Sequence, residues 1–250
     1  MANDDKKGTY TYEYPRPAMT ADCVIFGFDG QALKILLIER GLEPYKGYWA
    51  LPGGFMRMNE TIDQCAMREL REETNMKEVY IEQMHVFSNV NRDPRGRVVT
   101  VAFIALVRPS EHKIVGGDDA SNAMWFNAAT LPPLAFDHAK IVEYARNYLR
   151  EVLRVRPVAF RLLDDLFTVD ELRKVYEEIN GTTYDRRNFQ RKLMQADLLC
   201  EPEENQATRG RRYSVKPSLK KLFGRQSASE EDIDDSDNSE PGSIKDIFNF

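Results

Sequence analysis

Cysteine, histidine and tryptophan are scarce in this chain of 250 residues, which holds three cysteines, three histidines and two tryptophans. The cysteines, Cys23, Cys65 and Cys200, are odd in number and far apart, so they match neither a disulfide framework nor the ligand spacing of a zinc site. Disulfide-stapled secreted domains and zinc modules are therefore excluded. So little cysteine fits a reducing compartment, and we expect a cytoplasmic protein.

Long apolar runs are missing as well. No stretch approaches the roughly 20 apolar residues that a membrane-spanning helix needs. The first eight residues, MANDDKKG, lack the apolar core of a signal peptide. We therefore expect no membrane partner. A chain of 250 residues has room for two modest domains.

The net charge of −5 is a misleading average, because acidic and basic residues are segregated near the C-terminal end. Residues 181–226 hold eleven Lys and Arg against five Asp and Glu, whereas residues 227–250 hold eight acids and one lysine. The Ser-, Asp- and Glu-rich end predicts a disordered acidic tail over 227–250. The stretch before it predicts a basic module that meets a polyanion.

A helix is predicted over residues 61–74. Thr61, with Gln64 three residues later, is a capping-box pattern that marks its start. Apolar residues then recur every three or four positions and define a side that faces a core. Glu69 and Glu73 fall on that same side, one turn apart, where like charges repel each other.

Carboxylates clustered beside a core are costly unless a cation neutralises them. Oxygen ligands suit Mg²⁺ or Mn²⁺, and Mg²⁺ keeps part of its shell for water and phosphate oxygens. Arg68 can pair with Glu60 and orient it. The alternative is a solvated acidic helix face, but the preceding glycine pair and the spacing favour a metal site. The predicted metal ligands are the carbonyl oxygen of Gly54 and the carboxylates of Glu69, Glu72 and Glu73.

The run from Gly54 to Met76 resembles the Nudix box, G-x5-E-x7-R-E-U-x-E-E-x-G-U with U an aliphatic residue. Its one departure is Asn75 in place of glycine, at a helix end where Asn tolerates the left-handed conformation. The resemblance implies an α/β fold, the Nudix α/β/α sandwich with a mixed sheet, and hydrolysis of a nucleoside diphosphate linked to another group. The general base stays open. The catalytic residues that the resemblance implies are Glu60, Arg68, Glu69, Glu72 and Glu73.

The remaining segments of this domain alternate strands and turns. Asp29-Gly30 and Asp93-Pro94-Arg95-Gly96 are turn signals between apolar runs. Residues 1–17, with alternating tyrosines, should be loosely ordered, and the Nudix domain should span residues 18–153. The predicted strands cover residues 21–28, 33–38, 80–90, 98–107 and 123–126, and the predicted closing helix covers residues 137–155.

Two further segments point to a ligand. Arg92, Arg95 and Arg97 surround a turn, and arginine suits phosphate through paired hydrogen bonds, although a solvated hairpin tip is the alternative. The segment L-P-P-L-A-F-D-H places Phe136 and His138 at a helix start. Both segments are similar to the ADP-ribose pyrophosphatase branch of the family, which implies ADP-ribose or a related nucleotide sugar in the cleft. The predicted ligand-binding residues are Gly53, Gly54, Arg92, Arg95, Arg97, Phe136 and His138.

The basic stretch belongs to a predicted module over residues 154–226. We expect a helix over 157–166, a second that Thr168 and Glu171 cap, and a basic third helix from residue 183 or 184. Residues 210–215 fit the returning strand of a wing, which completes a winged helix-turn-helix. Outward Arg, Asn and Lys supply donors for phosphates and base edges. The predicted DNA-binding residues are Arg186, Arg187, Asn188, Arg191, Lys192, Arg211 and Arg212.

This module is similar to the winged helix of NrtR-type transcription regulators, which belong to the same Nudix branch as AraR-type regulators. The resemblance implies operator DNA as partner and a homodimer. It also implies a Nudix-domain ligand that alters DNA affinity: ADP-ribose in regulators of NAD metabolism, a sugar in arabinose regulators. From charge alone, a small helical cap with a solvated basic face is the alternative.

Two functions stay open after the sequence. The first is a Nudix-type regulator that binds DNA and ADP-ribose or a related nucleotide sugar, with a near-complete box that leaves Mg²⁺-dependent pyrophosphatase activity open. The second is an ADP-ribose pyrophosphatase whose C-terminal module is an accessory. Residues 157–216 favour the first function, because a housekeeping hydrolase does not need them.

Overall fold

The computed structural model describes residues 11–76, 79–112, 120–200, 211–217 and 219. Its N-terminal part is a mixed seven-stranded sheet with β3-β2-β1-β6-β5 as its main order, to which β4 adds at β1 and β7 at β2. β1 and β6 run parallel, and the other pairs are antiparallel. The strands are β1 (Ala18–Phe28), β2 (Leu33–Arg40), β3 (Trp49–Ala50), β4 (Gly53–Phe55), β5 (Ile81–Phe87), β6 (Val98–Val107) and β7 (Ala120–Asn127).

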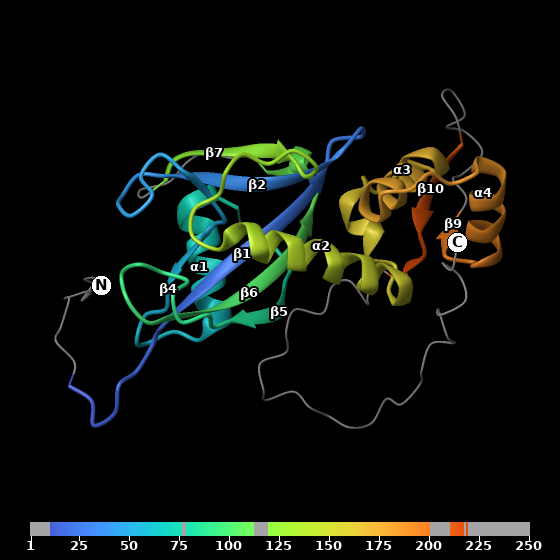
Figure 1. Cartoon of the computed structure of the whole chain (residues 1–250). Helices are drawn as coiled ribbons and strands as arrows, with labels where there is room; N and C mark the ends of the chain where they lie inside the picture. The colour runs from blue at the N-terminus through green and yellow to red at the C-terminus, as the bar shows by residue number, and fades with distance from the viewer. Residues whose placement is uncertain (1–10, 77–78, 113–119, 201–210, 218, 220–250) are drawn as a thin grey trace, which may run out of the picture.

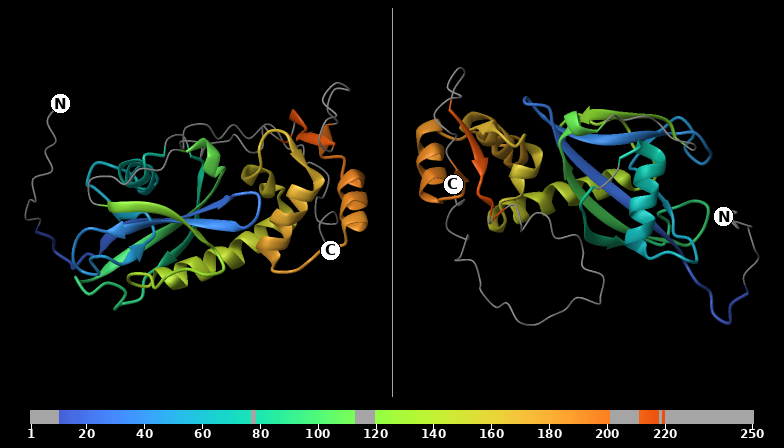
Figure 2. Two further views of the ribbon diagram at one scale, coloured as in Figure 1. Left: turned by 90° about the horizontal axis from the view of Figure 1, so that it is seen from above. Right: turned by 180° about the vertical axis from the view of Figure 1, so that it is seen from behind.

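Two helices cover this sheet, one on each face, as Figure 2 shows from above. Alternation along β1 explains the two layers, because successive side chains of a strand point to opposite faces. Cys23 and Ile25 pack with the first helix, whereas Val24 and Phe26 pack with the second. The expected Nudix sandwich is thus confirmed. The helices are α1 (Ile62–Thr74) and α2 (His138–Val155).

The C-terminal part is a small domain of helices and a three-stranded sheet of order β8-β10-β9. This arrangement confirms the expected winged helix, with β10 as the returning strand. A 3₁₀ turn, η1 (Pro109–Glu111), follows β6 in the first domain. The C-terminal elements are η2 (Val158–Leu162), β8 (Phe167–Thr168), α3 (Val169–Asn180), α4 (Arg186–Gln195), β9 (Leu199–Cys200) and β10 (Arg212–Val215).

Several sequence expectations about this part need correction. The helix predicted over residues 157–166 is wrong: only the 3₁₀ turn η2 forms there. Four of its five side chains are buried, so the segment is packed on all sides and has no solvent face to give it helical periodicity. The third helix begins at Arg186 rather than at residue 183 or 184, because Asp185 is its N-cap and accepts a hydrogen bond from the Asn188 N–H.

One apolar core runs through both domains. Phe28 and Leu33 at the end of the large sheet belong to the same cluster as Phe160, Leu172 and Phe189 of the winged helix. α2 carries this cluster across, since its buried side continues from the sheet to η2 and α3 (Figure 1). The C-terminal domain therefore packs directly on the sheet domain.

Three predicted segments fall partly or wholly outside the described residues, and one of them is the N-terminal segment, of which residues 1–10 lie outside. The predicted acidic tail, residues 227–250, lies outside them, as does Gly210 of the predicted wing strand. Among the described residues, no helix combines the length and the hydropathy that crossing a bilayer requires.

Candidate functional site

The helix that carries the acids, α1, is fixed at both ends by its own sequence. Thr61 and Gln64 form the predicted capping box, with hydrogen bonds of 3.2 and 2.9 Å between each side chain and the other residue's N–H. At the other end Asn75 adopts the left-handed conformation, with φ 57° and ψ 17°. The departure from glycine therefore leaves the helix end unchanged.

Two glycines bring the backbone of β4 against α1. A side chain at Gly54 would collide with the Glu69 carboxylate, and one at Gly53 would collide with the backbone of β1. The Gly53 N–H instead donates a hydrogen bond of 2.8 Å to Glu73. The glycine pair therefore sets the carboxylates of the helix directly against the strand.

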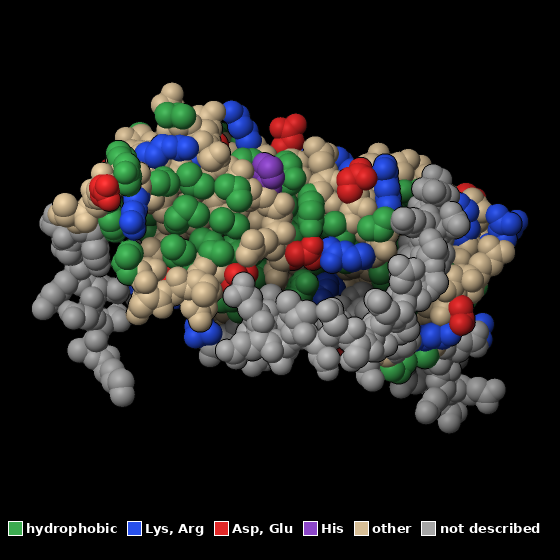
Figure 3. Space-filling view, turned by 90° about the horizontal axis from the view of Figure 1, so that it is seen from below, with side chains coloured by type: hydrophobic (Ala, Val, Ile, Leu, Met, Phe, Trp, Pro, Cys, Tyr) green, Lys and Arg blue, Asp and Glu red, His purple; other side chains and the backbone are tan. Residues whose placement is uncertain are grey.

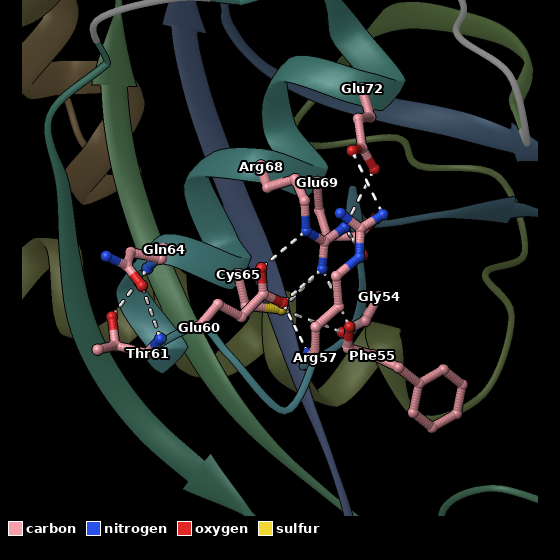
Figure 4. A network of polar contacts seen from close by, with 10 residues as sticks. All are labelled: Gly54, Phe55, Arg57, Glu60, Thr61, Gln64, Cys65, Arg68, Glu69 and Glu72. Atoms are coloured by element: carbon pink, nitrogen blue, oxygen red, sulfur yellow. Dashed lines mark hydrogen bonds and ion pairs between the residues drawn. The ribbon is translucent and has the colours of Figure 1, made fainter. Parts of the chain in front are cut away.

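Arg68 lies at the centre of a carboxylate network (Figure 4). Its guanidinium donates to Glu60 at 2.6 and 2.8 Å, to Glu69 at 2.6 Å and to Glu72 at 3.0 Å. The predicted Arg68–Glu60 pair is thus present. The hydrogen bonds from Arg68 lower the pKa of Glu60 from 4.5 to about 2, and Glu60 in turn raises the pKa of Arg68. Burial raises the pKa of Glu69, and the nearby Glu72 adds to that shift.

The donor set suits a hard divalent cation. Glu73 is only 8% exposed, and with Glu69, Glu72 and the Gly54 carbonyl it offers oxygen atoms alone. The Glu69 carboxylate fills the space that a Gly54 side chain would take, so this acid lies directly against the backbone of β4. In the described part of the chain, no three metal-ligating side chains converge on one point. The Arg68 guanidinium pairs with Glu69 and Glu72 and offsets part of their charge.

Beside this network lies a cavity of about 570 Å³. Its lining mixes acids with five arginines, which suits a ligand that carries both phosphates and hydroxyl groups. The buried Thr20 hydroxyl, which has no hydrogen-bond partner within the described structure, belongs to the lining. The charged lining residues are Asp22, Arg40, Glu43, Arg57, Arg68, Glu69, Glu72, Glu73, Arg92, Asp93 and Arg95.

Arg92 is an internal clamp rather than an exposed loop arginine. Its side chain is 4% exposed and binds both oxygens of Asp137, at 2.8 and 3.1 Å, and Asp22 at 3.3 Å. Asp22 lies on β1, whereas Asp137 is the N-cap residue of α2. The guanidinium therefore joins the strand to the start of the helix at the wall of the cavity.

His138, the first residue of α2, is held as a neutral imidazole. Burial lowers its pKa, and its Nδ1 accepts a hydrogen bond of 2.9 Å from the Leu51 N–H. An accepting Nδ1 places the proton on Nε2, which lies 3.8 Å from Asp22. His138 lines the cavity, as predicted, but one of its nitrogens is committed to the backbone.

An aromatic group lines the cavity beside Arg95. The Arg95 guanidinium lies 4.8 Å from the centre of the Phe55 ring and 5.3 Å from that of Phe136. The Arg40 guanidinium lies 4.8 Å from the centre of the same Phe136 ring. Phe136 has a φ of 53°, a conformation that costs energy for a bulky residue and that is found where surroundings impose it. These rings and cations form a surface for a planar ligand group.

The predicted ligand-binding residues do not all line the cavity. Arg97 lies outside the cavity lining and donates to the Ser88 and Asn89 carbonyls instead. Asp22, Arg40 and Phe55 line the cavity but were not predicted. Only Asp22 left a signal, since an acid interrupts an otherwise apolar strand segment.

The predicted DNA-binding surface lies on α4, where Phe189 and Leu193 face inward and the basic side chains face out. Lys192 is half-buried, and Arg186 forms an ion pair of 2.7 Å with Asp170 of α3. Arg191 donates to Asn188 at 2.6 Å, along the exposed side of the helix. The exposed members of the predicted set are Arg186, Arg187, Asn188, Arg191, Arg211 and Arg212.

Comparison with known families matches the two domains separately. The model of the NUDIX domain matches residues 16–145, and that of the NrtR DNA-binding winged helix domain matches residues 159–214. The chain is 35% identical over 196 residues to an ADPR responsive transcriptional repressor of Acinetobacter baylyi, a match that covers 77% of this chain and 78% of the repressor. It is 42% identical over 137 residues to an ADP-ribose pyrophosphatase of Methanocaldococcus jannaschii, covering 55% of this chain and 76% of that enzyme.

Solved structures of NrtR from Shewanella oneidensis are similar as well. The structure complexed with a 27mer DNA superposes with a TM-score of 0.68 at 34% identity, covering 80% of this chain and 94% of that one. The Nudix domain of the same protein, complexed with ADP ribose, superposes with a TM-score of 0.51 at 36% identity, covering 54% and 90%. The similarity thus spans the sheet domain, the winged helix and their arrangement.

Proposed function

This chain belongs to the Nudix family and carries an NrtR-type winged helix over residues 159–214, and we propose that it is an ADP-ribose-responsive transcriptional repressor. The observation that supports this most strongly is the pairing of two surfaces in one molecule. A lined cavity lies beside α1, and an exposed basic helix lies in a domain packed on the same core. A hydrolase would need only the first.

ADP-ribose fits the chemistry of the cavity. Its diphosphate would meet the guanidinium groups of Arg92 and Arg95. Its adenine would stack on the Phe136 ring, which lies 4.8 Å from Arg40 and 5.3 Å from Arg95. The Shewanella oneidensis Nudix domain that superposes on this one was solved with ADP ribose. A related nucleotide sugar would satisfy the same groups.

Operator DNA would be held by the exposed side of α4 and by the wing. Arg187, Asn188 and Arg191 project from the helix, while Arg211 and Arg212 lie at the start of β10. We propose a homodimer, in keeping with the two half-sites that such modules read. The face of the sheet domain seen from below in Figure 3 gathers hydrophobic side chains that a second copy would cover.

A second function rests on the acids of α1. If a divalent ion binds Glu69, Glu72, Glu73 and the Gly54 carbonyl, it would neutralise phosphate charge and activate water. This chain's own part would be to hold those acids ionised through Arg68 and to seat the ligand's diphosphate. The Methanocaldococcus jannaschii pyrophosphatase relative favours this alternative. Hydrolysis and repression can coexist in one chain.

The deciding experiment incubates the full chain with ADP-ribose and Mg²⁺ and follows AMP and ribose 5-phosphate. The same preparation is titrated with DNA from upstream of its own gene, with and without ADP-ribose. We expect specific DNA binding that ADP-ribose releases. Fast turnover with only salt-sensitive, nonspecific DNA binding would instead make the chain a pyrophosphatase with an accessory module.

One variant separates the two roles. Glu73→Gln removes a proposed metal ligand, so we expect it to abolish any turnover and to leave DNA binding unchanged. Glu143→Gln on the exposed side of α2 makes the same chemical change away from the cavity and serves as the control. If Glu73→Gln lost DNA binding with its fold intact, the two roles would not be separable.

A further inference from the structure

The β1–β2 hairpin and α2 both run from the cavity to the winged helix, where each contacts one of two adjacent residues of α3. At the far end of the β1–β2 hairpin, the Leu33 N–H donates a hydrogen bond of 3.1 Å to Glu178. Along α2, Arg150 donates one of 2.9 Å to the Ile179 carbonyl. Glu178 and Ile179 are adjacent in the last turn of α3, and Figure 1 shows the hairpin and α2 both extending toward that domain.

The same two elements are joined at the cavity by Arg92. It binds Asp22, six residues before the end of β1, and Asp137 at the start of α2. The two elements are therefore connected at both ends, by Arg92 at the ligand end and by α3 at the DNA end. α3 packs on α4, since the ring centres of Tyr176 and Phe189 lie 5.6 Å apart.

Asp137 has two possible uses, and the structure shows one of them. It occupies the N-cap position of α2, but its side chain makes no capping hydrogen bond, and both of its oxygens bind Arg92. An aspartate at an N-cap that accepts a backbone N–H typically stabilises a helix. An anion that draws the Arg92 guanidinium away would release Asp137, which makes that bond once its backbone, now at φ −100° and ψ 18°, moves to the extended conformation of a capping residue.

We propose that Arg92 is the positioning residue that couples an anionic ligand in the cavity to the placement of the winged helix, by exchanging its Asp137 partner for the ligand's phosphate. This inference rests on the proposed function and names its regulatory step. A ligand shifts such an equilibrium only through a difference in its affinity for the two states. Arg92 supplies that difference, because the phosphate and the Asp137 carboxylate compete for the Nε and Nη2 hydrogens of one guanidinium.

The apolar core alone does not provide this coupling. It keeps the two domains in contact in both arrangements, since its contacts are non-directional. The hydrogen bonds at Glu178 and Ile179 are directional, so they pass a rotation or shift of β1 and α2 on to α3. The Arg92 clamp sets that rotation at the cavity.

The test uses the full chain and compares operator affinity with and without saturating ADP-ribose. Asp137→Asn keeps a capping side chain but removes the charge that holds Arg92. We expect its DNA affinity without ligand to match that of the ligand-bound wild type. We expect ADP-ribose to change it less than about twofold, against a wild-type ratio in the usual range of about 5 to 150. Glu143→Gln, an identical chemical change on the exposed side of α2, should keep the wild-type ratio.

A second variant tests the far end without touching the cavity. The double substitution Glu178→Ala with Arg150→Ala removes both bonds to α3. We expect ADP-ribose affinity within about twofold of wild type but a DNA response reduced to less than a third of the wild-type ratio. Retained ADP-ribose binding shows that each variant is folded.

The outcomes separate the two ideas. If wild type responds to ADP-ribose and both variants keep its full ratio, the coupling through Arg92 is overturned while the repressor stands. If wild type binds ADP-ribose without any change in DNA affinity, the proposed function fails and the coupling fails with it. Loss of the response in Asp137→Asn and in the double variant, with the control unchanged, establishes the coupling.

Discussion

Helices α1 and α4 both carry many charged residues, but most of the charges of α1 are paired with one another, whereas those of α4 face solvent. In α1 the charges bind one another: Arg68 pairs with Glu60, Glu69 and Glu72, and Arg68 and Glu60 are largely buried. In α4 the basic side chains project from a helix whose apolar side is buried. The first helix is organised before any ligand arrives, whereas the second keeps its charge in solvent for an external polyanion. Charge density alone would not have distinguished them.

The largest expected effect is on thermal stability, and it comes from removing Arg68, which holds the ion pairs of α1 together. Arg68→Ala leaves three carboxylates without their shared cation, and removal of one partner from a buried ion pair costs about 3 to 5 kcal/mol. We expect the melting temperature to fall by about 6 to 20 °C, measured by circular dichroism. Arg187→Ala, the matched loss of an exposed arginine on α4, should change it by less than about 1 °C. Equal effects of the two variants would contradict the contrast.

The next effect should appear in DNA binding alone. Arg187→Ala with Arg191→Ala removes two donors, and each such contact contributes about 1 to 3 kcal/mol. We expect operator affinity to fall by about 30-fold or more, with ADP-ribose binding and thermal stability unchanged. Titration by fluorescence anisotropy at two salt concentrations would also show a shallower salt dependence. Undiminished affinity would place the DNA surface elsewhere.

Lowering the pH should reduce the unfolding free energy through the ion pairs of α1, whereas the basic side chains of α4 stay charged. Arg68 holds the folded-state pKa of Glu60 at about 2, below its ordinary value of 4.5. A lowered carboxyl pKa stabilises the fold above pH 4.5, and this stabilisation is lost as the pH falls from 4.5 toward 2. We expect the unfolding free energy of wild type to fall more steeply through this window than that of Arg68→Ala, by urea titration at each pH. Parallel curves would show that the pair adds no stability.

The smallest effect compares the two helix ends that adopt the left-handed conformation. Asn75 ends α1 with φ 57°, and Gly181 ends α3 with φ 65° and with no atom near the position of a side chain. Asn75→Gly should raise the unfolding free energy by about 0.5 kcal/mol, and Gly181→Asn should lower it by about the same amount. Urea unfolding of both variants measures this. Changes of the same sign would show that contacts, rather than backbone strain, decide these positions.

Local signals predicted the fold best. Both capping boxes, the left-handed Asn75 and the Arg68–Glu60 pair follow from residues close in sequence or on one helix face. The helix expected over residues 157–166 failed because tertiary packing, which buries six of its ten residues, overrides the local helical periodicity of the sequence. β3 and β4 were missed because strands of two and three residues carry no alternation.

The cavity was predicted less completely than the helix beside it. The acids of α1 and Phe136 stood in motifs. Arg40 reaches the cavity from the end of a strand that gave no signal, and Asp22 was marked only as an acid within an apolar strand. Arg92 and Arg97 stand five residues apart in one turn, yet one is buried between two acids and the other binds backbone carbonyls. Whether an arginine faces a ligand depends on partners that are distant in the sequence. The spacing of the arginines themselves does not predict those partners.

The core shared by both domains has a consequence for how this protein can be divided. A cut near residue 156 would leave Phe28 and Leu33 uncovered on one fragment and Phe160 and Leu172 uncovered on the other. Each fragment would expose an apolar face and tend to associate with whatever covers it. Limited proteolysis of the folded chain should therefore leave the two fragments bound together after the backbone is cleaved. The boundary between the domains can be assigned in the sequence, but the apolar core of the folded molecule is continuous across it.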